Sequence, residues 1–160
     1  MKVVFLDIDG VFNSHRTCLA LGGIPSGMKK KAVKFLDPLA ISMVREICKL
    51  ANAKIVLSST WRKVRPFQEY AKEFDLPIID RTESYSDKGH MRGYEIEDWL
   101  DNHPDVTHYA IIDDDSDMLE SQKTNFVHVN GLEGFLYQHA LRLGEILGVN
   151  PWDRPRSKTD

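Results

Sequence analysis

Three short apolar runs, each followed at once by acidic or hydroxyl side chains, constrain the fold of this chain more than any other feature. Residues 3–6 are uninterruptedly apolar, and residues 54–57 and 108–112 repeat the pattern. Runs of this length that are rich in β-branched residues are typical of strands buried on both faces of a parallel sheet. Weaker runs at 77–79 and 126–129 predict two further strands.

Segments with helical periodicity separate these predicted strands. They cover about 37–50, 63–74, 93–103 and 135–147. Strands that alternate with helices predict an α/β fold, here a Rossmann-like three-layer sandwich with a central five-stranded parallel sheet. In such sheets the active site lies at the carboxyl ends of the strands.

The length of 160 residues fits one domain of ordinary size. We expect a single catalytic domain over 1–150 and a frayed, charged tail over 151–160. The stretch 13–36 is rich in Gly and Lys, and it is predicted to be an irregular functional loop or flap. Neither this stretch nor the segment before Arg92 is long enough for a substantial cap domain, so we expect a minimal cap or none.

The composition sets broad limits on function. The net charge is −3, which argues against a surface coated in positive charge for non-specific nucleic-acid binding. No apolar run approaches the roughly 20 residues that span a bilayer, and Asp7 comes too early for a signal peptide, so we expect a cytoplasmic protein without membrane contact. The two cysteines, Cys18 and Cys48, show neither zinc-site nor disulfide spacing.

Acidic residues gather directly after two of the predicted strands. Asp7 and Asp9 follow the first strand, and the run 113–117 contains four aspartates after the strand that ends at Ile112. Carboxylates crowded at neighbouring strand ends are tolerable when a hard cation lies between them, and oxygen ligands suit Mg²⁺. The two clusters therefore predict a shared magnesium site.

Two weaker patterns fit a phosphate ligand. The string 57–62, Leu-Ser-Ser-Thr-Trp-Arg, places hydroxyls and free backbone N–H groups at a strand–helix junction, where phosphate binds readily. Lys88 and Arg92 lie near the start of the third predicted helix, where a cation can neutralise phosphate. The run 29–31 with Lys34 forms a basic patch that could contact a polyanionic substrate.

Taken in order, these motifs resemble the haloacid dehalogenase (HAD) superfamily of phosphatases. The resemblance covers about residues 3–130 and rests on Asp7-x-Asp9-Gly10-Val11, then Ser58, then a basic residue, then Asp113-Asp114. More narrowly, the strings 57–62 and 92–100 look like the HAD domains of RNA-repair and polynucleotide phosphatase systems.

The resemblance implies roles for the matched residues. Asp7 would be the nucleophile that forms an aspartyl-phosphate, and Asp9 would be the general acid and then the base that activates water. Ser58, with Ser59 as a close alternative, would hydrogen-bond the phosphoryl oxygens, and Arg92 would supply the cation unless Lys88 does. Mg²⁺ would be held by Asp7, the backbone carbonyl of Asp9, Asp113 and Asp114, with Asp117 as a further candidate. Substrate contacts are expected from Ser59, Thr60, Arg62, Lys88 and Lys30.

The resemblance and the open site predict a Mg²⁺-dependent phosphomonoesterase. The expected substrate is a nucleotide or the terminal 3′-phosphate of a nucleic acid, with a small molecule or a phosphoprotein as the alternative. A non-enzymatic phosphoacceptor domain like a response-regulator receiver is an alternative from another class. A receiver, however, carries its acceptor aspartate on a middle strand, and here that strand ends in Ser58 and Ser59. The oligomeric state is left open.

Overall fold

A computed structural model describes residues 1–25, 32–85 and 91–153. Its centre is a sheet of five strands in the order β3-β2-β1-β4-β5, and every neighbouring pair is parallel. The strands are β1 (Lys2–Leu6), β2 (Ala53–Leu57), β3 (Ile78–Arg81), β4 (His108–Asp113) and β5 (Phe126–His128). The predicted parallel sheet of the α/β class is thus confirmed.

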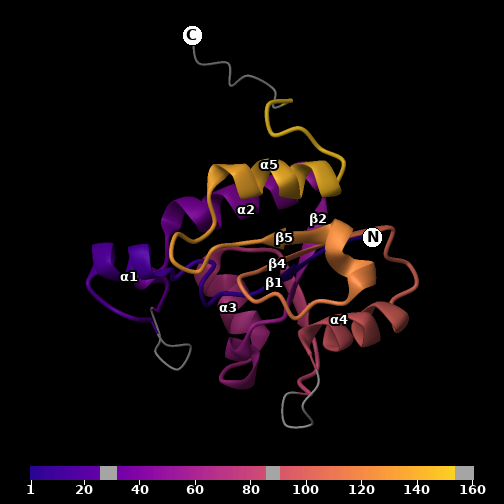
Figure 1. Cartoon of the computed structure of the whole chain (residues 1–160), viewed down its shortest axis with the longest axis horizontal. Helices are drawn as coiled ribbons and strands as arrows, with labels where there is room; N and C mark the ends of the chain where they lie inside the picture. Colours follow the sequence, from indigo (N-terminus) through magenta and orange to yellow (C-terminus); the bar gives the residue numbers. More distant parts are fainter. Residues whose placement is uncertain (26–31, 86–90, 154–160) are drawn as a thin grey trace.

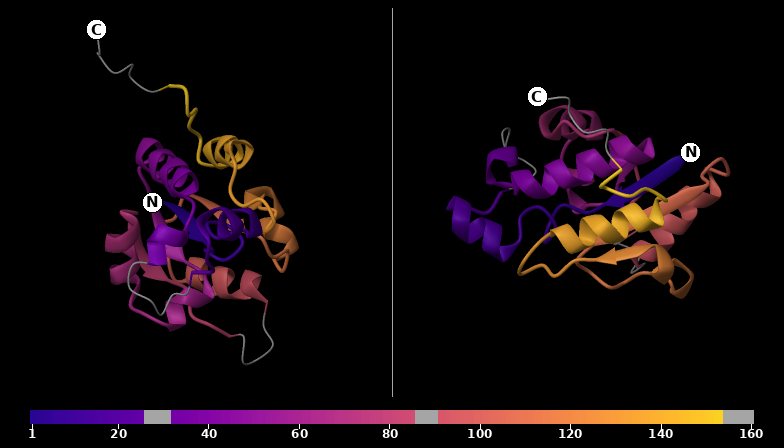
Figure 2. Two further views of the ribbon diagram at one scale, coloured as in Figure 1. Left: turned by 90° about the vertical axis from the view of Figure 1, so that its left-hand side faces the viewer. Right: turned by 90° about the horizontal axis from the view of Figure 1, so that it is seen from above.

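Helices cover both faces of this sheet. The α-helices are α1 (His15–Leu21), α2 (Pro38–Ala51), α3 (Phe67–Phe74), α4 (Arg92–Asp101) and α5 (Tyr137–Ile146). The short 3₁₀-helices are η1 (Ala32–Phe35), η2 (Thr60–Lys63) and η4 (Glu120–Asn125). Helices α2 and α5 lie side by side on one side of the sheet, and α4 lies on the other (Figures 1 and 2).

The alternation of side chains along β1 explains the three layers. Val4 and Leu6 join the larger hydrophobic cluster, which includes the buried faces of α2 and α5. Val3 and Phe5 point the other way, into a second cluster with α4. Successive side chains of a strand point to opposite faces, so a strand that is apolar throughout requires cover on both sides.

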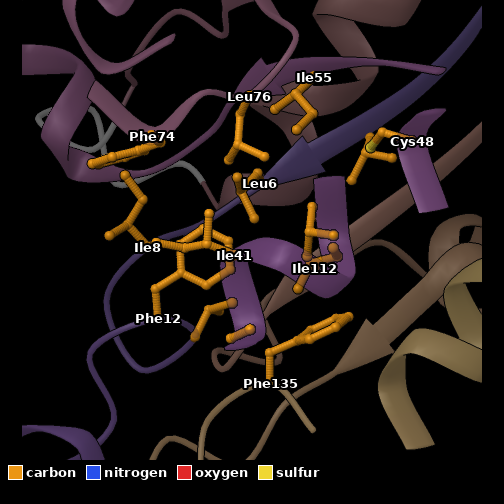
Figure 3. Packing of buried hydrophobic residues seen from close by; sticks show 14 of the residues in the cluster. Leu6, Ile8, Phe12, Ile41, Cys48, Ile55, Phe74, Leu76, Ile112 and Phe135 are labelled. Atoms are coloured by element: carbon orange, nitrogen blue, oxygen red, sulfur yellow. The ribbon is translucent and has the colours of Figure 1, made fainter. Parts of the chain in front are cut away.

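The larger hydrophobic cluster packs beneath the carboxyl-terminal halves of the central strands. Leu6, Ile55 and Ile112 come from three neighbouring strands and belong to one cluster with Ile41 of α2 (Figure 3). Each of these side chains is almost fully buried. Burial of one such side chain stabilises the folded state by about 1.5–3 kcal/mol, so this packing holds the strand ends in fixed positions.

Helix α2 follows its sequence signals closely. The Asp37 carboxylate accepts hydrogen bonds from the backbone N–H groups of Leu39 (2.9 Å) and Ala40 (3.1 Å), and Pro38 occupies the first turn. An N-cap carboxylate and a proline that needs no hydrogen-bond partner both favour a helix start at this point. The prediction of a helix from 37 to about 50 is confirmed.

Two predicted segments need correction. The helix expected over 63–74 is shorter, since α3 begins only at Phe67 with Pro66 as its N-cap, because a proline disfavours helical backbone in the residue before it. Lys63 instead ends the 3₁₀-helix η2. The stretch 13–36 is not irregular throughout, since it contains α1 and η1. Helix α1 begins with the N-cap Ser14 and ends at Gly22 with φ +73°. These short elements are the regular structure described between Gly10 and α2, in agreement with a minimal cap.

The predicted boundary between a domain at 1–150 and a tail at 151–160 stays a prediction. Residues 151–153 are described, and the Trp152 ring lies 6.1 Å from the Tyr137 ring of α5. Lys30, with the rest of the basic run 29–31, and Lys88 lie outside the described residues.

Candidate active site

The register of the sheet brings the carboxyl ends of three strands to one level. Leu6 pairs with Leu57 of β2 and with Ile112 of β4. The next residue of each strand, namely Asp7, Ser58 and Asp113, therefore lies at the same edge. The ladder continues there, because the Asp7 N–H donates to the Ile112 carbonyl at 3.0 Å and the Ser58 N–H to the Leu6 carbonyl at 3.0 Å.

Three carboxylates converge at this edge. One oxygen each of Asp7, Asp113 and Asp114 lies within 4.8 Å of the others. Asp114 approaches this closely because Gly10 and Gly131 leave room for it. A Cβ atom would lie 2.1 Å from Asp114 Oδ2 at Gly10 and 2.5 Å from it at Gly131, and Gly10 also has φ +68°, which favours glycine.

The donor set of this cluster fits a hard divalent cation. Asp7 Oδ1 and Asp113 Oδ2 are buried and accept no hydrogen bond, and both lie beside the single Nη1 atom of Arg92. Three crowded carboxylates carry more negative charge than one guanidinium balances, and oxygen-only ligands are those that Mg²⁺ prefers. Asp9, the fourth predicted ligand, contributes no side-chain oxygen to this group, and its expected contact through the backbone carbonyl stays a prediction.

Arg92 supplies positive charge beside the cluster. Its Nη1 lies 3.2 Å from Asp7 Oδ1 and 2.8 Å from Asp113 Oδ2. Arg92 is the first residue of α4, so the helix start carries the guanidinium to the strand ends. Of the two predicted cations, Arg92 thus lies at the site, and Lys88 falls outside the described residues.

The electrostatics of the cluster reflect crowded like charges. Burial raises the pKa of Asp7, although Arg92 and a hydrogen bond from the Ser59 side chain act in the opposite direction. Burial and the neighbouring Asp7 carboxylate raise the pKa of Asp113 in the same way. Burial disfavours the charged form of Arg92, but Asp7 and Asp113 outweigh it and raise the pKa of that guanidinium. Further positive charge would let all the carboxylates ionise together.

Asp9 lies at the same loop but is held apart from the three converging carboxylates. Its Oδ1 accepts hydrogen bonds from Asn13 Nδ2 (2.7 Å) and Trp61 Nε1 (3.0 Å). Its Oδ2 faces the Thr60 hydroxyl at 3.4 Å. Asn13 and Trp61 are functional candidates that the sequence did not reveal, because a Trp after a buried strand is most simply interpreted as a core residue.

The three hydroxyl residues after β2 differ in the contacts that they make. The Ser59 side chain contacts Asp7 and also accepts a hydrogen bond from the Trp61 N–H at 3.4 Å. The Ser58 hydroxyl is fully buried and has no hydrogen-bond partner. Thr60 is exposed and contacts Asp9. The side chains of Ser59 and Thr60 therefore contact the two aspartates after β1, whereas the Ser58 hydroxyl forms a hydrogen bond with neither.

Arg62 is buried, and its guanidinium is paired with residues other than the three carboxylates. It is 4% exposed, its Nη2 lies 2.6 Å from Glu95 Oε2 of α4, and its Nη1 donates to the Ser58 carbonyl. Burial lowers the pKa of Arg62, and the Glu95 charge opposes this. We therefore assign Arg62 a positioning role between the serine loop and α4, in place of the expected substrate contact.

Asp117 is likewise placed away from the three carboxylates. Its Oδ2 accepts a hydrogen bond from the Arg92 N–H at 2.9 Å, and its carbonyl accepts one from the Gly93 N–H at 3.2 Å. These contacts cap the start of α4, where a negative charge also suits the helix dipole. Asp117 thus fixes the helix that carries Arg92.

The parallel sheet, the acidic strand ends and the helix-borne arginine together define a HAD-type α/β domain. The family model described as "HAD domain in Swiss Army Knife RNA repair proteins" matches residues 3–140, and the chain belongs to that family. No curated protein and no solved structure matches it. Within the described part of the chain, none of the helices combines the length and the apolar character needed to cross a membrane.

Proposed function

We propose that this chain is a Mg²⁺-dependent phosphomonoesterase that acts through an aspartyl-phosphate on Asp7. The convergence of the Asp7, Asp113 and Asp114 oxygens beside Arg92 carries this proposal. A cation site next to a buried carboxylate suits the approach of one anion to another, which is the main obstacle to attack on a phosphate. Membership in the HAD family supports the same reaction.

In the first step, an Asp7 carboxylate oxygen attacks phosphorus and the bond between phosphorus and the ester oxygen breaks. Asp9 donates its proton to the leaving alkoxide. In the second step, Asp9 takes a proton from water, the water oxygen attacks phosphorus, and Asp7 is released as inorganic phosphate forms. Because Asp9 Oδ1 already accepts two N–H groups, Oδ2 is the oxygen that carries the proton.

The remaining residues bind and orient the phosphoryl group. Arg92 would neutralise the oxygens nearest Asp7, and the hydroxyls of Ser58, Ser59 and Thr60 would donate hydrogen bonds to the others. Mg²⁺ held by Asp7, Asp113, Asp114 and the Asp9 carbonyl would offset negative charge on the phosphate and on Asp7.

We further propose the 3′-phosphate end of a nucleic acid as the substrate. The family description, which names RNA repair, supports this choice. The minimal cap supports it too, because an open site admits a polymer end, whereas a small metabolite would be poorly shielded from water.

The direct test is phosphate release from oligoribonucleotides with a 3′-phosphate, a 5′-phosphate or neither, compared with free nucleotides and a phosphopeptide. We expect release from the 3′-phosphate end in Mg²⁺, none in EDTA, and none from Asp7→Asn. Asp115→Asn is the matched control, because Asp115 is exposed in the same acidic run and contacts Asp113 only through its backbone N–H (2.9 Å). Equal rates on free nucleotides would contradict the nucleic-acid substrate.

The same assay separates this enzyme from a receiver-like phosphoacceptor. A phosphoacceptor domain stops after one phosphoryl transfer, whereas Asp9 in its hydrogen-bonded position should support rapid turnover. Phosphate in large molar excess over protein is therefore the expected result. Release limited to one molecule per chain would favour the receiver-like function.

A further inference from the structure

A basic groove lies at the same edge of the sheet as the candidate active site. It has a volume of about 400 Å³ and is bordered by η2, the first turn of α3 and the last residue of β3. Its basic lining residues are Arg62, Lys63, Arg65 and Arg81. The mechanism proposed above uses none of their charges.

The four basic side chains differ in exposure. Arg62 is buried in its pair with Glu95, and Arg65 Nη2 lies 2.7 Å from Glu73 Oε2. Lys63 and Arg81 are both exposed. Arg81 Nη1 donates to the Arg62 carbonyl at 2.8 Å, which anchors its guanidinium at the groove. The side chains of Lys63 and Arg81 are therefore the parts of this basic lining that a ligand can reach.

The 3₁₀-helix η2 links this groove directly to the site. Thr60 begins η2 and contacts Asp9, and Lys63 ends it at the groove. With a rise of about 2.0 Å per residue, the two ends of η2 are separated by about 6 Å along its axis. A strand whose end is bound at Asp7 would thus meet the groove with its first phosphodiesters.

We propose that this groove binds the sugar–phosphate backbone of a single-stranded nucleic acid whose terminal phosphate enters the active site. The proposal rests on the proposed function for the nature of the substrate. A groove that combines positive charge with an aromatic surface is the usual platform for a single strand, and partly buried Phe67 lines this one. The Lys63 ammonium and the Arg81 guanidinium would contact successive phosphates.

The test compares wild type with the double variant Lys63→Gln/Arg81→Gln. For each, kcat/KM is measured on a 3′-phosphorylated decaribonucleotide and on p-nitrophenyl phosphate, and anisotropy follows binding of a labelled 3′-hydroxyl decaribonucleotide. Each phosphate contact contributes a slope of about 0.7 to the salt dependence for single strands, so two contacts give about a sevenfold loss of affinity between roughly 50 and 200 mM salt. We expect the double variant to lose this part of the salt dependence. Its ratio of decanucleotide to p-nitrophenyl phosphate kcat/KM should fall about tenfold.

A comparable groove at the opposite end of β2 supplies the matched control. It has a volume of about 420 Å³ and is lined by Lys49 and Lys54. Lys49→Gln/Lys54→Gln should keep the wild-type ratio and salt dependence. Wild-type behaviour of the Lys63/Arg81 variant, or an equal loss in the control, would overturn the proposal. If no phosphate ester is hydrolysed, the proposed function fails, and the anisotropy measurement still decides whether the groove binds the strand.

Discussion

The orientation of the Asp9 carboxylate depends on two neighbouring side chains that take no part in the proposed reaction. The Trp61 indole N–H and the Asn13 amide both bind Oδ1 and leave Oδ2 for proton transfer. The Trp61 ring is otherwise a core element, 5.7 Å from the Tyr70 ring. One residue thus connects the hydrophobic core to the proposed acid–base group.

Trp61→Phe should therefore impair catalysis more than substrate binding. The variant keeps an aromatic ring but loses the donor that orients Asp9, so we expect kcat to fall at least tenfold, about 1.4 kcal/mol, with little change in KM. Steady-state kinetics on a 3′-phosphorylated oligonucleotide measure both constants. Trp99→Phe is the control, because the Trp99 indole donates to Asp80 at 2.8 Å away from the catalytic cluster. An equal loss in both variants would show that Trp61 acts only through packing.

Among the elements, helix α4 must be positioned accurately, because it holds Arg92 beside two carboxylates. Asp117 caps its first turn, and Glu95, one turn further along, forms the buried pair with Arg62 and accepts a hydrogen bond from the Tyr85 N–H at 2.7 Å. Arg62 in turn binds the Ser58 carbonyl. This pair therefore joins the serine loop to the helix that carries the cation.

Arg62→Met should leave the buried Glu95 carboxylate without its cation, at a cost of about 3–5 kcal/mol in the free energy of unfolding. The double variant Arg62→Met/Glu95→Met removes both charges and should recover most of that stability. Urea unfolding measures the free energy in each case. Activity should stay low in the double variant, because α4 is no longer tied to the serine loop. Full activity there would contradict a positioning role.

Helix α5 carries a pH-sensitive cap. The Leu136 N–H donates to His139 Nδ1 at 2.8 Å, so that nitrogen must be unprotonated, and burial together with the charge of His128 lowers the pKa of His139. A pKa below the unfolded value means that the unfolded chain binds more protons. The stability contributed by this group is therefore present above the unfolded pKa of about 6.5 and is lost as the pH falls below it.

His139→Gln isolates this contribution, because its amide oxygen can accept the Leu136 N–H at any pH. The Tm of wild type should fall more steeply than that of the variant between about pH 7.5 and 5.5. Thermal unfolding followed by circular dichroism gives both curves. His103→Gln is the control, because His103 follows the end of α4 and its ring contacts the Trp99 carbonyl of that helix at 2.6 Å. Parallel curves for wild type and His139→Gln would count against the cap.

The sequence predicted strands and acidic motifs better than it predicted helices. Strands β1, β2 and β4 are mostly apolar because their central residues are buried on both faces, and their ends could be placed within a residue. Helix α1 escaped notice because it has no apolar stripe, and its Leu19 is 87% exposed. Pro66 is evident in the sequence, but the sequence does not indicate whether this proline lies in the first turn of a helix or just before the helix.

Side-chain partners were the part of the site that the sequence could not predict. Asp7, Asp113 and Asp114 could be grouped because parallel strands end at one edge. The exposed-looking Arg62 instead pairs with Glu95, 33 residues away, and Asp117 caps α4 in place of joining the other aspartates. These partners are determined by the packing of elements that are distant in the sequence, and a local sequence pattern does not indicate that packing.

For the molecule as a whole, the order of the strands explains why the proposed catalytic and binding residues all lie at one edge of the sheet. Strand β1 is central, and its neighbours β2 and β4 end level with it, so the proposed nucleophile, hydroxyls and metal ligands come together without any long loop. Strand β3 ends at the same edge and contributes Arg81 to the basic groove. At this edge, the side chains that follow β1 and β4 are therefore mainly anionic, and the groove beyond β2 and β3 is lined by cationic side chains.

The central claim is that Asp7 accepts the phosphoryl group and Asp9 supports its later release. Stopped-flow measurement of p-nitrophenolate from p-nitrophenyl phosphate with Asp9→Asn tests it most directly, because this leaving group needs no proton. We expect a burst of about one equivalent per chain followed by slow turnover, and no burst with Asp7→Asn. Steady release without a burst from Asp9→Asn, together with wild-type release from Asp7→Asn, would contradict the account.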